Sequence, residues 1–503
     1  MKTCLIESTK ISRRSFLQAL GALTLSGSLA ACGDTGKAKS DRLAAGSLAY
    51  TPDEVVTVEF SDGGITVSPE DAAGLAVEGT ALSVSGAGVY ALSGNCADGS
   101  VKVEAQTEDV VLLLDGLTLT SADTAPIVCG ESTGVTIAVV DGTENTLTDS
   151  EANDPDNAAD NENAEKAVVK CKDGSQVVLC GGGALTVNAL GKNGIKSGTA
   201  LDDRDASLTI RELTLNIEAL VNDAINAEQR LKVESGNLTI AAGEDAIHCD
   251  MELNIGAEGT TGPAITVSTC CEGLEGAILN IHSGNMDITS TDDCLNAANS
   301  DLGDYAFEIN ISGGTIKAYS SEGDGFDSNG TLTITGGDIS VWTANAADNQ
   351  PLDADGRITI SGGTVLAAGG SAGMGFSISA SQPYVIFGGG RDSSLSLAGG
   401  EAFSIADESG KSVLDSTALC DAAFLFYSSP ALTAEGRYSV QSTVTATAKT
   451  GEADTQFGGN GGPGGSGGQR PDGMTPPDGQ MPQGQPPQSD GTTPSELPAA
   501  SSN

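Results

Sequence analysis

A heptapeptide with oxygen-bearing side chains on both sides of one apolar residue recurs through the middle of the chain. In its clearest copy, GDGFDSN, Asp324 and Asp327 flank Phe326. The other copies read KNGIKSG, NDAINAE, EDAIHCD, CEGLEGA and DDCLNAA, and NQPLDAD is a degraded seventh. Carboxylate and amide oxygens are the ligands that Ca²⁺ prefers in proteins. The pattern therefore indicates a calcium-binding surface, provided that the fold brings the copies together.

Alignment of the copies on their apolar residue gives two columns of polar residues. The first column contains Asn193, Asp223, Asp245, Glu272, Asp293 and Asp324, and the second contains Lys196, Asn226, His248, Glu275, Asn296, Asp327 and Asp353. Ionised carboxylates stacked ~4.8 Å apart repel one another, so water or a cation must screen them. The calcium ligands that we predict are Asp223, Asn226, Glu244, Asp245, Asp292, Asp293, Asn296, Asp324, Asp327 and Asp353. The alternative is a solvated acidic edge whose Asp and Asn residues only cap turns.

Short strand-like segments must position these columns. Segments such as GALTVNAL, NLTIAAG and LTITGGDISVWTA alternate aliphatic and polar residues, and glycine- or asparagine-rich turns separate them. The copies recur every ~20–30 residues, as in solenoids, whose coils bury their apolar faces only when stacked. We predict an all-β, right-handed parallel β-helix. Its central Ile, Leu or Phe residues point inward.

The two ends of the chain differ from this repetitive middle. Residues 1–31 resemble a twin-arginine signal peptide with Arg13 and Arg14, and the segment LAAC makes Cys32 the lipidated residue of a lipoprotein. A plain cleaved signal is the alternative. We expect a tether over residues 32–50, the β-helix over 51–450 and a disordered tail rich in Gly, Pro and Gln over 451–503.

The charge of the chain limits its partners. With 68 acidic and 24 basic residues, its formal net charge is −44, which argues against nucleic acid as a ligand. No later stretch has the ~18 apolar residues of a membrane helix, so we expect membrane contact only through the lipid. The chain is therefore expected to be a monomer outside the cytoplasmic membrane or at the cell surface. Its nine cysteines beyond Cys4 and Cys32 are interpreted as small packing residues.

The segments LLLDGLTLT and GTENTLTD, together with the NDAI and EDAI repeats, resemble the bacterial carbohydrate-binding β-helix family of cellulolytic clostridia. The resemblance covers roughly residues 50–445. It implies a pectate-lyase-like fold, bound calcium and binding of plant polysaccharides without established lyase activity. It also implies that Asp223, Asp245, Asp293, Asp324 and Asp327 occupy the repeat positions that such calcium sites use.

We therefore expect a non-enzymatic protein that binds a pectin-like or cellulosic polysaccharide with calcium. A lyase of this fold would need a Lys or Arg base, and none accompanies Asp245, Asp293 or Asp324 in the repeats. A surface adhesin or spacer that binds no glycan is the alternative from another class. Trp342 and Tyr319 are candidates for stacking on sugars, and both are equally compatible with packing.

Overall fold

The structure is a computed structural model that describes residues 43–300, 302, 305–344, 349–370, 377–388 and 395–454. The signal peptide, Arg13, Arg14, Cys32 and the tail from residue 455 lie outside the described residues. The described residues form strands and two short 3-10 helices, η1 (Pro52–Glu54) and η2 (Glu151–Asn153). None of their helices has the length and apolar character needed to cross a membrane. The prediction of an all-β protein is confirmed.

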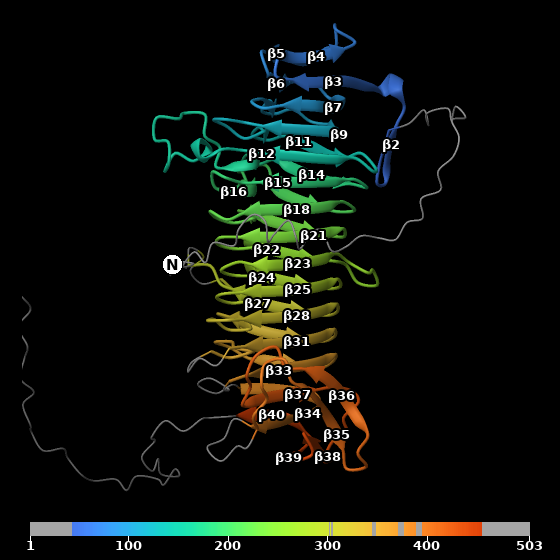
Figure 1. Cartoon of the computed structure of the whole chain (residues 1–503), viewed down its shortest axis with the longest axis vertical. Coiled ribbons are helices and arrows are strands. Elements are labelled where there is room, and N and C mark those ends of the chain that lie inside the picture. Colours follow the sequence, from blue (N-terminus) through green and yellow to red (C-terminus); the bar gives the residue numbers. More distant parts are fainter. Residues whose placement is uncertain are drawn as a thin grey trace, which may run out of the picture. The chain divides into compact units, whose positions relative to one another are not determined.

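Most strands belong to one sheet of thirty-four strands, in which each turn of the chain pairs in parallel with the next (Figure 1). Three ladders of strands run through it. The first contains β6 (Ala81–Val84), β8 (Ser100–Val103), β10 (Ile127–Cys129), β13 (Ala167–Cys171), β16 (Asn193–Ser197), β19 (Ile225–Ala227), the first parts of β22 (Ile247–Ile255) and β24 (Leu274–Ile281), β26 (Leu295–Ala297) and β29 (Phe326–Ser328).

The second ladder follows the first along each turn of the chain. It contains β3 (Val55–Ser61), β7 (Gly88–Cys96), the first half of β9 (Val110–Thr120), β11 (Gly134–Val139), β14 (Gln176–Gly181), β17 (Ser207–Ile210), β20 (Arg230–Val233), the last parts of β22 and β24, β27 (Glu308–Ile311), β30 (Thr331–Ile334), β32 (Ile358–Ile360) and β34 (Ser377–Gly388).

The third ladder completes each turn. It contains the second half of β9, β12 (Glu144–Thr148), β15 (Ala184–Asn188), β18 (Thr214–Ala219), β21 (Asn237–Ala242), β23 (Ala264–Thr269), β25 (Asn285–Ser290), β28 (Thr315–Ser320), β31 (Asp338–Thr343) and β33 (Thr364–Gly369).

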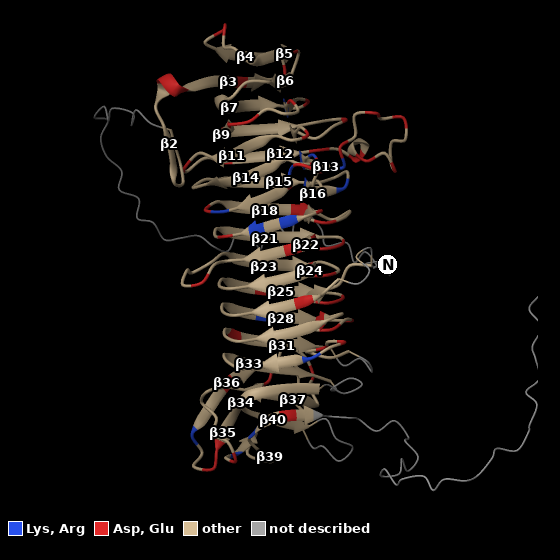
Figure 2. Ribbon diagram, turned by 180° about the vertical axis from the view of Figure 1, so that it is seen from behind, with Lys and Arg blue, Asp and Glu red and all other residues tan. Residues whose placement is uncertain are grey.

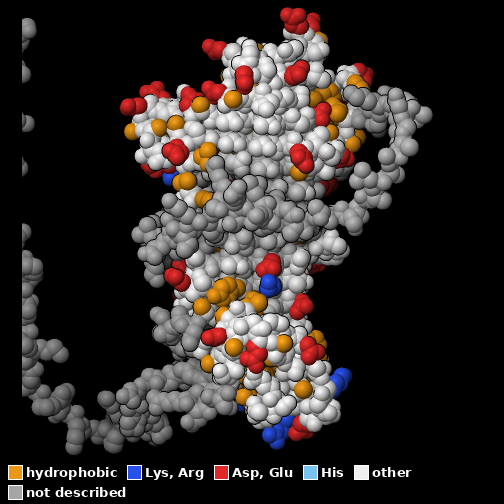
Figure 3. All heavy atoms as spheres, viewed as in Figure 1, with side chains coloured by type: hydrophobic (Ala, Val, Ile, Leu, Met, Phe, Trp, Pro, Cys, Tyr) orange, Lys and Arg blue, Asp and Glu red, His pale blue; other side chains and the backbone are white. Residues whose placement is uncertain are grey.

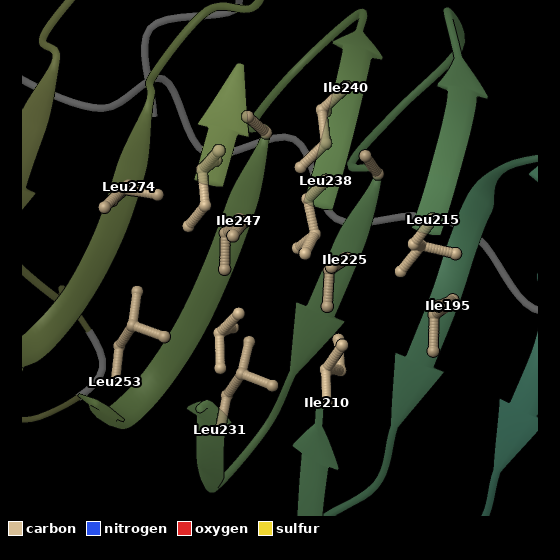
Figure 4. Packing of buried hydrophobic residues seen from close by; sticks show 14 of the residues in the cluster. Ile195, Ile210, Leu215, Ile225, Leu231, Leu238, Ile240, Ile247, Leu253 and Leu274 are labelled. Carbon is tan, nitrogen blue, oxygen red and sulfur yellow. The ribbon is translucent and has the colours of Figure 1, made fainter. Parts of the chain in front are cut away.

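Inward-facing aliphatic residues stack from turn to turn and form one continuous core. Figure 4 shows Ile195, Ile225, Ile247 and Leu274 following one another along the first ladder, and their pairing in register continues to Leu295 and Phe326. All six are buried. A single turn could not bury such residues, so stacking is the source of its stability. The alternation predicted from the sequence therefore sets both the core and the outward-facing polar columns.

The residue before each central apolar residue must be small because the next turn passes close to it. A Cβ atom placed on Gly273 would lie 2.3 Å from the carbonyl oxygen of Cys294, far inside van der Waals contact. Ala224, Ala246, Cys294 and Gly325 occupy the same position of the repeat. The nine internal cysteines are free thiols, and eight of them are buried, which fits their interpretation as packing residues.

Antiparallel strands occur at both ends of the described chain. Residues 43–50, which the sequence assigned to the tether, form a hairpin of β1 (Leu43–Ala45) and β2 (Leu48–Tyr50). β4 (Gly64–Ser68) and β5 (Leu75–Glu78) also pair antiparallel, with β3 and β6. After β34, the chain forms β37 (Phe424–Ser428), β40 (Lys449–Asp454) and a four-stranded sheet of β35 (Ala402–Asp407), β36 (Ser412–Thr417), β38 (Arg437–Val440) and β39 (Val444–Thr447). The repeat pattern did not predict this antiparallel region.

Candidate functional site

The second column of polar residues lies in one line because its strands pair in register. Lys196 pairs with Asn226, Asn226 with His248, His248 with Glu275, Glu275 with Asn296 and Asn296 with Asp327. Leu352 pairs with Phe326 in a parallel bridge, which places Asp353 next in the series. The structure therefore brings residues that are far apart in the sequence onto consecutive turns of one surface.

Residues of the first column contact the following turn through their side chains. The Asp223 and Asp245 carboxylates accept hydrogen bonds from the backbone N–H groups of Asp245, at 3.2 Å, and Glu272, at 3.3 Å. In the same way, Asp293 accepts a hydrogen bond of 2.6 Å from the N–H of Asp324. Each of these contacts uses one carboxylate oxygen. The second oxygen of Asp223 accepts a hydrogen bond from Asn226, and that of Asp245 lies 3.1 Å from His248 Nδ1. The first column thus joins adjacent turns, as the turn-capping alternative requires.

Three carboxylates at the end of the columns form a group that we call the lower cluster. One oxygen each from Asp324, Asp327 and Asp353 lies within 4.8 Å of the other two. Burial and then neighbouring carboxylates raise the pKa of Asp324 to about 7 and that of Asp327 to about 6, and burial also raises the pKa of Asp353. Among the described residues, no Lys or Arg forms an ion pair with these three acids.

A buried amide oxygen adjoins the lower cluster. The Gln350 backbone N–H donates to Asp324 Oδ1, and the Gln350 side chain hydrogen-bonds to Asp353. Gln350 is only 3 % exposed, yet its Oε1 has no hydrogen-bond partner. An unpartnered buried carbonyl oxygen carries a free-energy cost that a cation would remove. Gln350 has the first-column position of the degraded copy NQPLDAD, two residues before Leu352, but it is absent from the predicted ligands.

A second group, which we call the upper cluster, consists of Asp245, His248 and Glu275. His248 Nδ1 lies 3.1 Å from Asp245 Oδ2 and in closer contact with Glu275 Oε2. Burial raises the pKa of Asp245 to about 8, whereas contact with His248 lowers the pKa of Glu275 in spite of burial. His248 lies in β22, and its half-buried ring contacts carboxylates. The shared column position of His248 and Glu275 was the signal for this contact.

The remaining predicted ligands fall into two groups, of which Asp292, Asp293 and Asn296 lie near the clusters. Asp293 is half-buried, and its burial, together with the charges of Asp327, Asp292 and Asp324, raises its pKa to about 8. Asn296 Nδ2 donates a hydrogen bond of 2.8 Å to Glu272 Oε2. The other predicted ligands lie farther up the columns. There, Asn226 donates to Asp223 at 2.7 Å, and burial followed by the charge of Asp223 raises the pKa of Glu244.

The second column begins with a basic residue, Lys196. Lys196 Nζ lies 2.8 Å from Glu228 Oε1 and donates to Asn226 Oδ1 at 2.7 Å. Acidic residues recur down the described stack whereas basic residues are few (Figure 2), and acidic side chains also predominate over basic ones on the face in Figure 3. The described columns therefore contain a base only in their upper half, at Lys196 and His248.

Stacking on a sugar requires an exposed aromatic ring, and neither of the two aromatic candidates is fully exposed. Trp342 is 0 % exposed and packs among residues of the C-terminal antiparallel sheet, including Phe403 at a ring-centroid distance of 6.1 Å. Tyr319 is partly buried against the same cluster. Trp342 is therefore a core residue and does not offer a face to a sugar ring.

A shallow depression of about 430 Å³ lies on another part of the surface. Its lining includes Glu108, Gln176, Ser207 and Thr209 and contains none of the predicted calcium ligands. The site chemistry therefore does not coincide with a deep pocket. A linear polymer lying along a row of ions would not require one.

Three comparisons relate this chain to known proteins. The family profile described as carbohydrate-binding domain-containing protein matches residues 78–373, which is more than half of the chain. A carbohydrate-binding domain-containing protein of Acetivibrio thermocellus is 32% identical over 146 residues, covering 29% of this chain and 50% of that relative. The chain thus spans half the length of that relative. A solved polysaccharide lyase-like protein from C. thermocellum, a gadolinium derivative, has 22% identity and a TM-score of 0.33, covering 61% of this chain and 96% of its own.

Proposed function

The chain belongs to the family of carbohydrate-binding domain-containing proteins, and from this premise we propose that it binds an acidic polysaccharide through calcium held on its stacked acids. The observation that carries the proposal is the lower cluster. It gathers three carboxylates and a buried residue with an unpartnered amide oxygen, and no Lys or Arg among the described residues forms an ion pair with these acids. The family supports carbohydrate binding, and the cluster supports the identity of the cation.

The ligand chemistry of the lower cluster fits calcium. Asp324, Asp327 and Asp353 supply carboxylate oxygens, and Gln350 adds an uncharged one. Ca²⁺ takes six to eight oxygen ligands at about 2.3–2.6 Å, so carboxylate oxygens within 4.8 Å of one another can share one ion. Four protein oxygens would leave coordination positions for water or for a ligand. Asp293, Asp292 and Asn296 are the predicted ligands nearest to this cluster along the columns.

Calcium also resolves the conflict between the charge of the chain and an acidic ligand. A protein with a formal net charge of −44 repels a polyuronate. A bound divalent ion with open positions reverses the local field and can coordinate sugar carboxylates directly. Because Trp342 is buried, the described columns favour such ion-mediated contact over aromatic stacking on a neutral, cellulosic chain. A pectin-like polymer is therefore the ligand class that we propose.

The same proposal includes the architecture and location of the protein. Parallel pairing of successive turns is compatible with a right-handed parallel β-helix, which is the fold that we propose for the stacked turns from β3 to β34; the predicted range of 51–450 was too long, because the residues after β34 pair antiparallel. We propose export by the twin-arginine route and lipid attachment at Cys32. A Cys32→Ala variant should then appear in the soluble fraction rather than with the membrane.

Retention of the full chain on immobilised polygalacturonate tests this function. We expect retention with calcium, loss of retention with a chelator, and no release of unsaturated uronides from the polymer. The D324N/D327N variant should lose retention. D338N should keep it, because Asp338 is an exposed acid of the third ladder on the same turn.

Each alternative gives a different result in this experiment. If the chain is not retained on polygalacturonate either with or without calcium, the result would contradict the proposal and favour a structural spacer. Uronide release would identify a lyase. Retention that survives both the chelator and D324N/D327N would show that the acids do not mediate binding.

A further inference from the structure

The upper cluster differs from the lower one by containing a nitrogen ligand whose second ring atom is already engaged. His248 Nε2 lies 2.8 Å from Asp250 Oδ1, on the side of the ring away from Asp245 and Glu275. If Nε2 donates its hydrogen to Asp250, the neutral imidazole presents a lone pair at Nδ1. This arrangement fixes the ring and its tautomer through a carboxylate outside the cluster, as is usual for histidines that bind metals.

Three acceptor atoms then converge on one point. Nδ1 faces Asp245 Oδ2 at 3.1 Å and contacts Glu275 Oε2, and all three atoms lie within 4.8 Å of one another. A proton on Nδ1 could be donated well to only one of the two carboxylates. A divalent ion could serve all three atoms and would place two positive charges among three carboxylates.

A buried oxygen without a donor adjoins this cluster. Asn296 pairs with Glu275 on the neighbouring strand and is 8 % exposed. Its Nδ2 donates to Glu272, but its Oδ1 has no hydrogen-bond partner. The acceptors around Glu275 therefore outnumber the donors that the described side chains supply. This shortage of donors is independent of the His248 geometry and also favours a cation.

We propose that Asp245, His248 and Glu275 form a site for a borderline-soft divalent metal ion, of which zinc is the representative, with Asp250 as the residue that orients His248. Zinc is commonly bound by three protein ligands of N and O type, with a fourth position open. Tetrahedral bonds of about 2.1 Å place ligand atoms roughly 3.4 Å apart, which is close to the 3.1 Å between Nδ1 and Asp245 Oδ2, whereas Glu275 Oε2 would have to move away from Nδ1 to admit the ion. Calcium, by contrast, prefers oxygen ligands alone.

The proposed zinc ion joins two turns of the stack. Asp245 and His248 belong to the turn that contains the start of β22, and Glu275 belongs to β24 on the next turn. The surface would then hold two different ions, one in each cluster. This inference does not depend on the carbohydrate function, because the ligands and their orientation come from the upper cluster itself.

Cobalt and zinc titrations of the chelator-treated full chain test the site. Co²⁺ should give the visible absorption of a tetrahedral site with N and O ligands; Zn²⁺ should remove it, and excess Ca²⁺ should not. H248Q should weaken zinc binding at least about 100-fold, and D250N, which keeps the side-chain size, should weaken it roughly 10–100-fold. H282Q is the matched control, since His282 is the other histidine of the chain and hydrogen-bonds to Ser312 at 3.0 Å.

Several results would overturn the proposal. Absence of cobalt and zinc binding would show that a proton occupies Nδ1. Displacement of zinc by calcium, or thiolate absorption in the cobalt spectrum, would place the ion elsewhere. Unchanged zinc affinity in D250N would reject the orienting role, and calcium binding by H248Q serves as the check that this variant folds. Failure of retention on polygalacturonate would leave these spectra unaffected, so the two proposals fail separately.

Discussion

The upper and lower clusters occupy equivalent positions of the repeat, yet they present different chemistry. Both use one acid of the first column and residues of the second column on successive turns. In the upper cluster the second column supplies His248 and Glu275, whereas in the lower cluster it supplies Asp327 and Asp353. One residue per turn therefore decides whether a solenoid surface offers nitrogen and oxygen or oxygen alone. The fold fixes the spacing, and we propose that the side chain selects the ion.

The largest effect that separates the clusters should come from the core beneath the lower one. Phe326 is fully buried between Asp324 and Asp327 in the sequence, and Phe326→Ala should cost about 3–5 kcal/mol of unfolding free energy. Urea unfolding with and without calcium measures this cost. The change should also weaken calcium binding while zinc binding persists, as measured by titration. Equal loss of both ions would show that the clusters are not independent.

Removal of two lower-cluster carboxylates should produce the next largest effect. D327N/D353N leaves one of three charges, so calcium affinity should fall on the order of 100-fold or more. Isothermal titration calorimetry of the full chain measures the affinity. H248Q should leave calcium affinity within about threefold, because we propose that the upper cluster binds a different ion. An unchanged affinity in D327N/D353N would place calcium outside the lower cluster.

The stability of the metal-free protein should depend on pH, because the acids of the lower cluster become charged in a partly buried site as the pH rises. The pKa of Asp324 is raised to about 7 and that of Asp327 to about 6, from an ordinary 3.8. An acid with a raised pKa binds its proton more tightly when folded, so its stabilising contribution is complete below its ordinary pKa and is lost as the pH rises through the folded value. In chelator, the urea midpoint should fall between about pH 4 and pH 7.

Calcium should remove most of this decline because it stabilises the ionised carboxylates. D327N should make the chelator curve flatter, since asparagine does not titrate. A midpoint that rises with pH in chelator over the same range would contradict the raised pKa values of these acids.

A basic residue outside the columns should have the smallest effect. Lys317 and Asp287 form an ion pair of 3.1 Å with both side chains about half exposed, at 50% and 51%. K317A should change the unfolding free energy by about 0–1 kcal/mol and should change neither ion affinity. Thermal unfolding together with the two titrations checks this expectation. A strong effect on calcium binding would mean that basic residues outside the columns determine the electrostatic potential at the clusters.

The sequence allowed prediction of the columns because one apolar residue per copy defines their register. Ile195 through Phe326 pair as the alignment requires, and even the degraded copy places Leu352 beside Phe326. The orientation of His248 depends on Asp250, which lies outside the columns, and the importance of Gln350 depends on a missing hydrogen-bond donor. Neither property has a repeating signal.

The C-terminal region was difficult to predict for a different reason. Its segments have the same alternation as the parallel strands, so the pattern does not reveal that β37 runs antiparallel to β33 and β34. The antiparallel sheet also covers Trp342, which the alternation alone would leave on the outer surface. Burial by a distant segment cannot be inferred from the periodicity of one strand.

The positions of the ions themselves give the most direct test of the calcium proposal. Crystals of the full chain grown with calcium and zinc can be measured on both sides of the zinc absorption edge and at a longer wavelength where calcium scatters anomalously. We expect calcium among Asp324, Asp327 and Asp353, and zinc between His248 and Glu275. A map without calcium density at the lower cluster, or with the same ion in both clusters, would contradict this expectation.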